Sequence, residues 1–419
     1  MKAIVNKWTS CNLVVKIVIG LVIGVVIGIF APGASFVGIF GTVFVGALKA
    51  IAPVLVAFLV MSALSKSKKG LGSRFRTVIV LYILSTFMAA IVAVVASYLF
   101  PITLVLDGAA ADGTPPSGIG EVFSNLLTNM VSNPIEAVST GNYLGVLFWA
   151  IIMGLVMKKV ASETTINVIA DFSEVITKVV AGIIQFAPIG IMGLVYSAVA
   201  ESGLGIFTTY GKLLAVLVGS MLVVALVVDP IIAFIFLKRN PYPLVLTCLK
   251  ESGVTAFFTR SSAANIPVNM ELCESLGLDK DFYSVSIPLG STINMDGAAV
   301  TITIMSLATA FTMGISVDIP TAVILSIMAT LGACGASGVA GGSLLLIPMA
   351  CSLFGISSDV SMQVVAIGFI IGVVQDSLET ALNSSGDVMF AATAEYHDRM
   401  KRGEQVDISM KNRKKKGSN

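Results

Sequence analysis

The sequence predicts an all-α integral membrane protein, and three observations support that fold class. Hydrophobic residues occupy 56% of the 419 positions, and charged residues occupy only 12%. The mean hydropathy of +0.95 lies well outside the range of a soluble domain. Apolar runs that are long enough to cross a hydrocarbon core of about 30 Å recur along the whole chain.

Charge and cysteine usage exclude several classes of protein. The net charge of +2 is too small to indicate a nucleic-acid partner. The five cysteines have no paired spacing, so we interpret them as small buried hydrophobic residues and not as disulfides or metal ligands. The only histidine, His397, lies in the polar tail. No cleavage-site pattern follows the first apolar run, so we expect that span to be retained.

Six apolar segments in the first part of the chain predict membrane spans. Basic residues flank them within residues 66–76 and near residues 159 and 239, whereas residues 101–140 carry acidic residues and no Lys or Arg. By the positive-inside rule, both termini lie in the cytoplasm. The basic C-terminal tail is expected to touch anionic membrane lipid. The predicted spans cover residues 16–32, 37–63, 77–100, 142–156, 169–200 and 204–237.

Two later segments are too polar or too rich in glycine for continuous spans. Residues 242–276 are broken by Pro267, and residues 320–354 contain GACGASGVAGGSLLLIP. Each precedes a helical stretch that is interrupted or marked by Asn, Asp and Gly, at residues 293–297 and 382–387. Irregular backbone at membrane depth survives only where it is buried or lines a cavity. The repeated order predicts a transporter with two related halves and a midplane site, and a pair of amphipathic surface loops is the alternative.

Four polar residues lie on one face of the last long apolar stretch. Asp376, Thr380, Asn383 and Asp387 are separated by offsets that stay within roughly 40° of one helical face at about 100° per residue. A carboxylate at the bilayer centre costs about 2.5–3.5 kcal/mol. A bound cation or a ligand ammonium group would offset that cost, so this helix is predicted to bind cargo. For Lys49 and Asp229, which sit near span ends or in helix interiors, we expect the ordinary structural roles of snorkelling or a mutual salt bridge.

Three motifs, TRSSAANIPV, PLGSTINMDG and QDSLETALNSSGD, resemble those of the dicarboxylate/amino acid:cation symporter family. This family includes transporters of glutamate and of neutral amino acids. The resemblance is strongest over residues 254–387 and extends through the earlier spans. It implies eight transmembrane helices and two re-entrant helical hairpins, built as inverted repeats. It also implies a homotrimer in the bacterial cytoplasmic (inner) membrane, whose transport domains move past a fixed scaffold.

The implied division of the chain has three parts. Residues 1–241 would form mainly the scaffold, residues 242–395 the transport core, and residues 396–419 a cytoplasmic basic tail. Span 3 (about 77–100) and span 6 (about 204–237) would associate with the transport core.

Asp376 is the first candidate for substrate binding. A carboxylate in a dry site pairs with the ammonium group of an amino acid and is neutralised by it. The structural alternative is an ion pair with a basic residue of a neighbouring helix. Arg260, which precedes the serines of the first hairpin, is expected either to pair with an acid or to face the substrate pocket.

The two hairpins supply further candidates. Hydroxyl and backbone N–H groups at Ser261 and Ser262 suit a substrate carboxylate, and plain helix capping is their structural alternative. Small residues in the second hairpin allow close backbone approach and movement of a lid, or simply tight helix packing. The full expected substrate set is Ser261, Ser262, Ala298, Gly338, Ala340, Gly342, Asp376, Glu379, Thr380 and Asn383.

Sodium is a hard cation that prefers oxygen ligands, such as carboxylates and the carbonyls freed where a helix unwinds. The offsets of 3 and 4 between Tyr82, Ser85 and Thr86 place them on one helical face, although an interhelical hydrogen bond explains Tyr82 alone. Matching to the family implies three sets of ligands for Na+ as the co-transported ion. The first is Asp387 with the carbonyls of Gly290, Asn294 and Asn383; the second is Asp296 and Asn294 with Tyr82, Ser85 and Thr86; the third is the carbonyls of Thr292, Gly332, Ala333 and Gly335.

Two positions depart from the pattern of family members that take acidic amino acids. Those members have an arginine at the position of Glu379 and a threonine at that of Ala298. An acidic substrate would meet like charge at Glu379, whereas a hydroxyl could hydrogen-bond to it directly or through water. We therefore expect small neutral hydroxy amino acids, serine and threonine, and alanine less because polar groups beside it would stay unpaired. A sodium-coupled carrier of acidic amino acids or dicarboxylates is the main alternative.

The predicted function is thus sodium-coupled symport by alternating access, and we do not expect an enzyme. An intramembrane hydrolase would need Asp296 and Asp376 as a water-accessible dyad, or a serine nucleophile with a base other than the tail histidine. A passive channel would not concentrate its substrate against a gradient.

Overall fold

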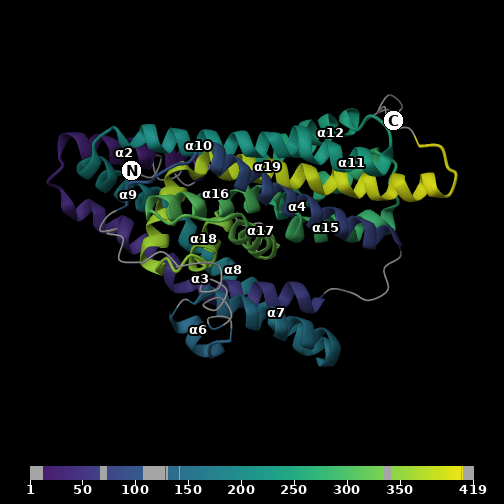
Figure 1. The fold of residues 1–419 in the computed structure, drawn as a ribbon, viewed down its shortest axis with the longest axis horizontal. Coiled ribbons are helices and arrows are strands. Elements are labelled where there is room, and N and C mark those ends of the chain that lie inside the picture. The colour runs from purple at the N-terminus through teal and green to yellow at the C-terminus, as the bar shows by residue number, and fades with distance from the viewer. Residues whose placement is uncertain are drawn as a thin grey trace, which may run out of the picture.

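The computed structural model describes residues 13–66, 73–106, 128, 131–140, 142–334, 341–406 and 408. All regular secondary structure in this part of the chain is helical, which confirms the predicted all-α class (Figure 1). By length and composition, five of these helices can cross a membrane, or six when one bent pair is taken as a single span. The architecture is that of an integral membrane protein.

One group of helices packs mainly against itself, with α3 touching α7, α8 and α9, and α2 lying along α9. Asn142 and Ser162 cap α7 and α8, because each side-chain oxygen accepts a hydrogen bond from a backbone N–H three residues later. The group comprises α2 (Leu13–Phe30), η1 (Ser35–Val37), α3 (Gly38–Lys66), α6 (Pro134–Thr140), α7 (Tyr143–Val160), α8 (Glu163–Ile184) and α9 (Ala187–Ser202).

Glycines on one face of α2 let α9 approach closely. A Cβ added at Gly20 would lie 2.1 Å from the carbonyl oxygen of Pro188, and one at Gly24 would lie 2.5 Å from that of Met192. Spacing of small residues by four is the usual means by which membrane helices bring their backbones together. The pair α2 and α9 therefore depends on these glycines.

The expected fifth span is two helices in the structure. The sequence predicted one span over residues 169–200, but α8 ends at Ile184 and α9 begins at Ala187, with a bend of 55°. Pro188 lies in the first turn of α9, where a backbone N–H would have no partner within the helix, so the N–H that proline lacks removes no hydrogen bond. Hydropathy alone does not distinguish such a bend from a straight span.

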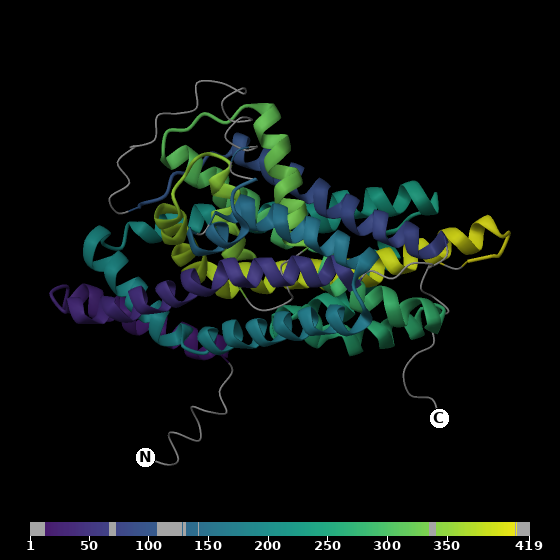
Figure 2. The same cartoon turned by 90° about the horizontal axis from the view of Figure 1, so that it is seen from below.

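A second group of helices surrounds the long helix α19, which runs along the long axis of the molecule among them (Figures 1 and 2). α4 contacts α16, α17 and α19, and α10 contacts α16 and α19. The group comprises α4 (Ser73–Leu99), α10 (Ile206–Val223), the π-helical η2 (Val224–Val228), α11 (Asp229–Leu237), α12 (Tyr242–Cys248), the π-helical η3 (Leu249–Gly253), α13 (Val254–Thr259), α14 (Ser262–Ser275), α15 (Lys280–Ile293), α16 (Asp296–Thr312), α17 (Ile319–Ala333), η4 (Ser343–Leu346), α18 (Ile347–Ser352) and α19 (Ser358–Lys401).

The first predicted hairpin segment breaks at a different residue from the one expected. Pro267 lies inside α14 and does not interrupt it. The chain instead turns at Arg260, which has φ +52° in the left-handed region, and at Ser261, whose side chain caps α14. A proline in the second turn removes one helical hydrogen bond, and the surrounding contacts tolerate that loss.

Of the two helical stretches marked by Asn, Asp and Gly, only the first is interrupted. α15 ends at Ile293 and α16 begins at Asp296, as predicted. By contrast, α19 is unbroken over 44 residues and includes residues 382–387. Its hydroxyls bond within the helix, as when Ser385 donates to the carbonyl of Ala381 at 2.7 Å, so polar composition there does not unwind it. The second stretch is therefore marked by these residues but not interrupted by them.

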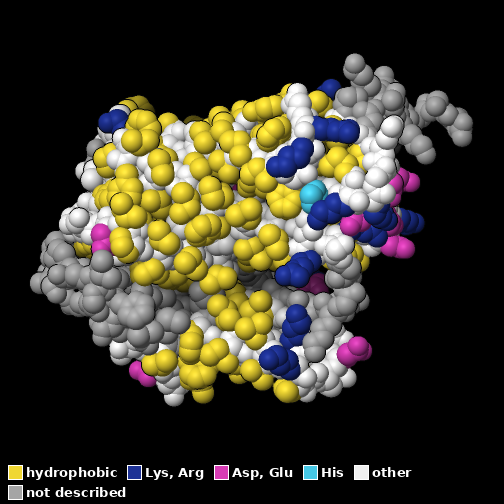
Figure 3. All heavy atoms as spheres, turned by 45° about the vertical axis from the view of Figure 1, so that its right-hand side comes forward, with side chains coloured by type: hydrophobic (Ala, Val, Ile, Leu, Met, Phe, Trp, Pro, Cys, Tyr) yellow, Lys and Arg dark blue, Asp and Glu magenta, His cyan; other side chains and the backbone are white. Residues whose placement is uncertain are grey.

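The surface fits a membrane environment. Figure 3 shows hydrophobic side chains over most of one face, with Lys and Arg gathered toward one end. Large side chains such as Val22, Phe40 and Phe234 are at least 45% exposed. A contiguous apolar surface of this kind is rare on soluble monomers.

A polar cluster at the start of α15 ties three helices together. Arg74 of α4 donates to Asp279 at 2.9 Å, and its guanidinium lies 5.3 Å from the ring centroid of Phe282. The Asp279 backbone N–H donates to Glu395 of α19. The hydrogen bond from Arg74, followed by one from the backbone N–H of Asp281, lowers the pKa of the Asp279 carboxyl from its ordinary value.

Replacement of Asp279 by asparagine is expected to lower the melting temperature slightly at neutral pH. Because the pKa of Asp279 is lower in the folded protein, its carboxylate stabilises the fold at any pH above the unfolded-state pKa of about 3.9. That stabilisation is lost as the pH falls through the folded-state pKa. Because both side chains are more than a quarter exposed, the effect should stay below about 1 kcal/mol. Thermal unfolding in detergent at several pH values tests this. A difference between wild type and variant that persists in acid would contradict it.

Candidate functional site

The interruption between α15 and α16 presents Asn294 to α19. Asn294 Nδ2 donates to Asp387 Oδ1 at 3.1 Å and to the carbonyl oxygen of Asn383 at 3.0 Å. Gly386 makes this approach possible, because a Cβ there would lie 2.7 Å from Asn294 Nδ2. The backbone N–H of Gly297 donates to Asn383 Oδ1 at 2.7 Å. The break and α19 are thus joined by three hydrogen bonds between buried groups.

Asp387 is fully buried and only partly satisfied. Its Oδ1 accepts from Asn294, while its Oδ2 is buried without a hydrogen-bond partner among the described residues. Tyr82 of α4 donates its hydroxyl to the carbonyl oxygen of Asp387 at 3.0 Å. Gly290 lies against both groups, since a Cβ there would come 2.8 Å from Asp387 Oδ1 and 2.9 Å from the Tyr82 hydroxyl.

Asp296 also has one carboxylate oxygen that accepts hydrogen bonds and one that does not. Its Oδ1 accepts from Ser85 at 3.0 Å and from Thr86 at 2.8 Å. Its Oδ2 is buried and has no partner in the described part of the chain. Ser85 also lies 3.2 Å from Asn294 Oδ1, which connects the two carboxylate environments. The structure therefore brings together the first and second predicted ligand sets.

These two carboxylates suit small hard cations. Neither makes an ion pair with a basic side chain of the described residues. A buried carboxylate without a counter-charge costs several kcal/mol, and each keeps one oxygen free to coordinate. The surrounding donors are carboxylate, amide, hydroxyl and carbonyl oxygens, which are the ligands that hard cations prefer.

The third predicted ligand set is only partly described. Gly332 and Ala333 are buried in the last turn of α17, whereas the Thr292 side chain is exposed and bonds to the carbonyl of Leu289. Cys334 lies 3.3 Å from the carbonyl oxygen of Ile293, so the end of α17 does meet the end of α15. Gly335 lies outside the described residues.

Asp376 is paired with a basic side chain. Arg260 Nε donates to Asp376 Oδ2 at 2.6 Å, and the backbone N–H of Gly341 donates to Oδ1 at 3.1 Å. Both side chains are at most 10% exposed. Thr380 donates its hydroxyl to the Asp376 carbonyl oxygen. The pair joins the tip of the first hairpin to α19, and Gly341, which sequence reasoning did not select, brings the second hairpin to the same carboxylate.

The hairpin residues that were expected to meet the substrate lie around this pair. Ser261 caps α14 by accepting from the N–H of Ala264 at 3.2 Å, and Ser262 is 2% exposed. Gly342 immediately precedes η4 in the second hairpin. Gly338 and Ala340 lie outside the described residues.

Glu379 sits in a hydrogen-bond network that the sequence did not reveal. Its Oε2 accepts from Thr301 at 2.7 Å, from Ser343 at 2.9 Å and from Gln375 at 2.5 Å. Gln375 also donates to Thr301, at 2.7 Å. The i, i+4 spacing of Gln375 and Glu379 was a usable signal, but Thr301 and Ser343 come from other helices. Ala298, one turn before Thr301 on α16, is fully buried.

A second polar network fixes the first hairpin to α19. Asn265 and Asn269 of α14 donate to Ser384 of α19 at 2.8 and 3.0 Å, and Ser252 of η3 donates to Asn269 at 2.5 Å. All four side chains are fully buried. Such a network, unlike apolar packing, holds both limbs of the hairpin in one register.

Comparison with known proteins places the chain in a family. Residues 13–396 match the sodium:dicarboxylate symporter family. A protein of Bifidobacterium adolescentis called serine/threonine transporter SstT is 57% identical over 416 residues, which cover 99% of this chain and 97% of the relative. Proteins of the same name from Streptococcus agalactiae and Streptococcus thermophilus are 59% and 56% identical over 396 residues, or 94% of this chain and 98% of each relative. The chain therefore belongs to the sodium:dicarboxylate symporter family, whose members are membrane transporters and not enzymes.

Proposed function

We propose that this protein takes up serine and threonine across the bacterial cytoplasmic membrane by sodium-coupled symport. The observation that carries the proposal is the pair of buried carboxylates, Asp296 and Asp387, that each keep one oxygen without a partner. The family supports sodium as the coupled ion, and the names of the relatives support the substrate class. Bound sodium ions would neutralise the two acids and brace the break around Asn294.

The Asp376–Arg260 pair is a neutral unit that a zwitterion can replace charge for charge. The substrate ammonium group would bind Asp376, and the substrate carboxylate would lie near Arg260 and the Ser261–Ser262 tip. Because the Gly341 N–H also reaches Asp376, both hairpins would close on the same bound amino acid. The pair thus keeps Asp376 neutralised until substrate arrives.

Glu379 would select among substrates by their side chains. Oε2 already accepts three hydrogen bonds, whereas Oε1 accepts none from a described residue. Oε1 would accept the hydroxyl of serine or threonine. An acidic substrate, the alternative for this family, would place like charge against it.

The family and the helix contacts support a proposal for the finer architecture. We assign eight transmembrane helices and two hairpins, with α12–α14 as the first hairpin and α17, η4 and α18 as the second. The contacts of α4 and α10 with α16 and α19 support their association with a transport core of residues 242–395. Residues 1–241 would otherwise form the scaffold of a homotrimer, and the basic ends and tail would face the cytoplasm.

Coupling follows from shared groups. Asn383 touches the sodium position through Asn294 and lies one turn from the substrate position at Thr380. Sodium would order the break, and the ordered site would then bind substrate more tightly. By reciprocity, substrate would raise sodium affinity by the same factor. Alternating access then moves the loaded core across the membrane.

Serine flux into sealed proteoliposomes, with the imposed sodium gradient as the only variable, tests the proposed function. We expect serine to accumulate against its gradient when sodium is outside, and threonine but not aspartate to compete. Equal accumulation with choline or potassium in place of sodium would contradict sodium coupling. Equal competition by aspartate would contradict the role of Glu379.

Replacement of Gly290 by alanine should weaken sodium binding. The added methyl group would meet Asp387 Oδ1 and the Tyr82 hydroxyl at less than 3 Å, which must displace one of them. A loss of about 1.4 kcal/mol would raise the half-saturating sodium concentration about tenfold. Gly219→Ala is the matched control, since a Cβ there meets nothing within 4 Å. Unchanged sodium dependence in Gly290→Ala would argue against a site at this position.

Replacement of Thr301 by valine should impair the recognition of hydroxylated substrates. The variant keeps the shape of the side chain but removes one of three hydrogen bonds to Glu379, at a cost of about 1–3 kcal/mol. The KM for serine should rise about tenfold, while competition by alanine changes less. Thr303→Val serves as control, because the Thr303 hydroxyl is buried and has no partner among the described residues. Equal effects of both variants would show that Thr301 acts only through packing.

A further inference from the structure

Asp229 is a buried acid in the middle of a membrane-spanning helix. It lies within the continuous helical run Ile206–Leu237, and it is 2% exposed. Its backbone N–H donates to the carbonyl of Val224 across the π-helical turn η2, so it does not stand at a free helix end. Pro230 follows and cannot donate to the carbonyl of Leu226, and the Tyr242 hydroxyl does so instead at 3.0 Å. π-helical turns of this kind often occur at functional sites.

The side chain of Asp229 has no compensating partner within the described residues. Its Oδ1 is buried without a hydrogen bond, and none of the basic side chains that the structure describes pairs with it. Asp296, Asp376 and Asp387, by contrast, all accept hydrogen bonds. At 2% exposure the Asp229 side chain does not snorkel, and the side chain of Lys49, the expected salt-bridge partner, lies outside the described residues. An ionised form without a partner would be strongly disfavoured here.

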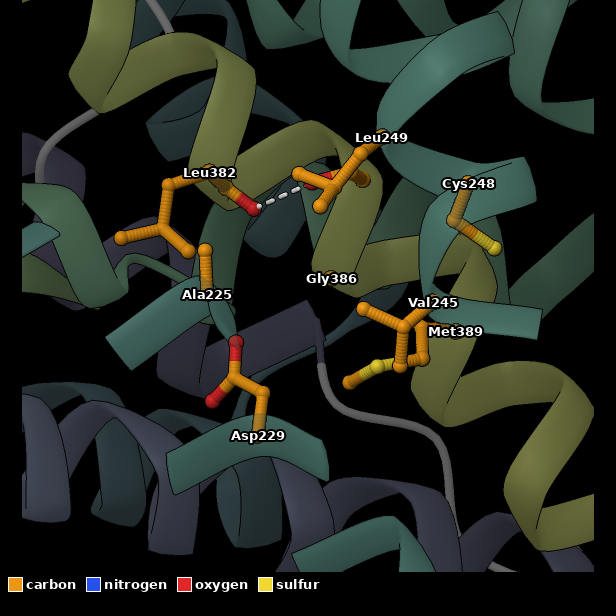
Figure 4. A pocket seen from close by; sticks show the side chains of 9 residues that line it. Ala225, Asp229, Val245, Cys248, Leu249, Leu382, Gly386 and Met389 are labelled. Carbon is orange, nitrogen blue, oxygen red and sulfur yellow. Dashed lines mark hydrogen bonds between the residues drawn. The ribbon is translucent and has the colours of Figure 1, made fainter. Parts of the chain in front are cut away.

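The carboxyl group borders a small cavity of about 10 Å³ between α11, α12 and α19. Figure 4 shows the carboxyl directed toward this space, with Ala225 and Leu382 above it and Val245 and Met389 to one side. A cavity of this size is at the lower limit for holding one water molecule. The side chains that line it are Ala225, Asp229, Val245, Cys248, Leu249, Leu382, Ser385 and Met389, together with Gly386.

The lining favours a proton over a metal ion. A metal ion needs a shell of oxygen ligands, but Asp229 and Ser385 are the lining side chains that carry oxygen. Ser385 donates its hydroxyl proton to the carbonyls of Ala381 and Leu382, at 2.7 and 3.1 Å, so its remaining lone pairs can only accept. A proton needs only a single oxygen to bind, and the Asp229 carboxyl supplies it.

We propose that Asp229 is a proton-binding site, separate from the substrate and sodium positions. The carboxylate takes one proton from water, forms an O–H bond and stays neutral in this conformation. Leu382, Ser385 and Gly386 form one wall of the cavity, on the same turns of α19 that present Asn383 and Asp387 to the candidate sodium site. The proton therefore lies next to the sodium position, on a neighbouring face of α19, with Gly386 between the two.

Infrared difference spectroscopy of the purified full-length protein tests this proposal. We expect the wild type to show a protonated-carboxyl C=O band that shifts in D₂O and is lost in Asp229→Asn. Asp171→Asn, which removes an exposed acid of α8, should leave that band in place. Because asparagine is a neutral isostere, the half-saturating sodium concentration should change by less than about tenfold, that is by less than about 1.4 kcal/mol.

Two results would overturn the proposal. Retention of the band in Asp229→Asn would show that the proton resides elsewhere. A wild type without the band, combined with sodium dependence weakened tenfold or more in Asp229→Asn, would make Asp229 an ionised sodium ligand. If asparagine prevents folding, Asp229→Ser removes the acid with a smaller side chain and must lose the band as well. The band does not depend on transport, so its result is distinguishable from failure of the proposed function.

Discussion

Two carboxylates that are buried without a counter-charge, Asp296 and Asp387, constrain everything around them. Each uses one oxygen to accept hydrogen bonds and leaves the other without a partner among the described residues. The chain is organised to hold them near each other. The helix breaks at Asn294 so that its amide can reach α19, and α4 contributes Tyr82, Ser85 and Thr86 from a third direction. The negative charge of these two carboxylates is not neutralised by a described basic side chain, which is a physical reason for cations to bind there. It is also a reason for substrate binding to depend on the bound cations.

The proposed substrate site is built differently, since Arg260 already neutralises Asp376. This difference gives the two sites different roles in the proposed mechanism. The carboxylates at the break need a cation, whereas the ion pair needs something that replaces both of its charges, which an amino acid does. The segment around η4 contacts both the ion pair, through Gly341, and Glu379, the proposed specificity group, through Ser343.

The sequence predicted the parts of this arrangement that depend on local pattern. Hydropathy located α4 to within four residues of its start, and the Asn-Met-Asp-Gly run located the helix break. The stripe from Asp376 to Asp387 is buried along one unbroken helix, as its period indicated. Local pattern failed where tertiary contacts decide the outcome. The bend before Ala187, the tolerance of Pro267 and the continuity of α19 through residues 382–387 all depend on neighbouring helices.

Contacts between residues that lie far apart in the chain are what the sequence mainly failed to predict. Arg260 and Asp376 lie 116 residues apart, and Thr301 and Ser343 reach Glu379 from two other helices. A single sequence offers candidates for such partners but no means of choosing among them. Asp229 was assigned an ordinary role for the same reason, because only the structure reveals that no described basic residue approaches it.

Equilibrium binding of radioactive sodium to the purified protein in detergent tests the central claim most directly. The wild type is compared with Asp296→Asn and Asp387→Asn, which keep the shape of each side chain and remove its charge. The account predicts saturable sodium binding in the wild type and a loss of bound sodium in each variant that still folds. Full binding in both variants would contradict the claim that these carboxylates exist to be neutralised by the transported ion.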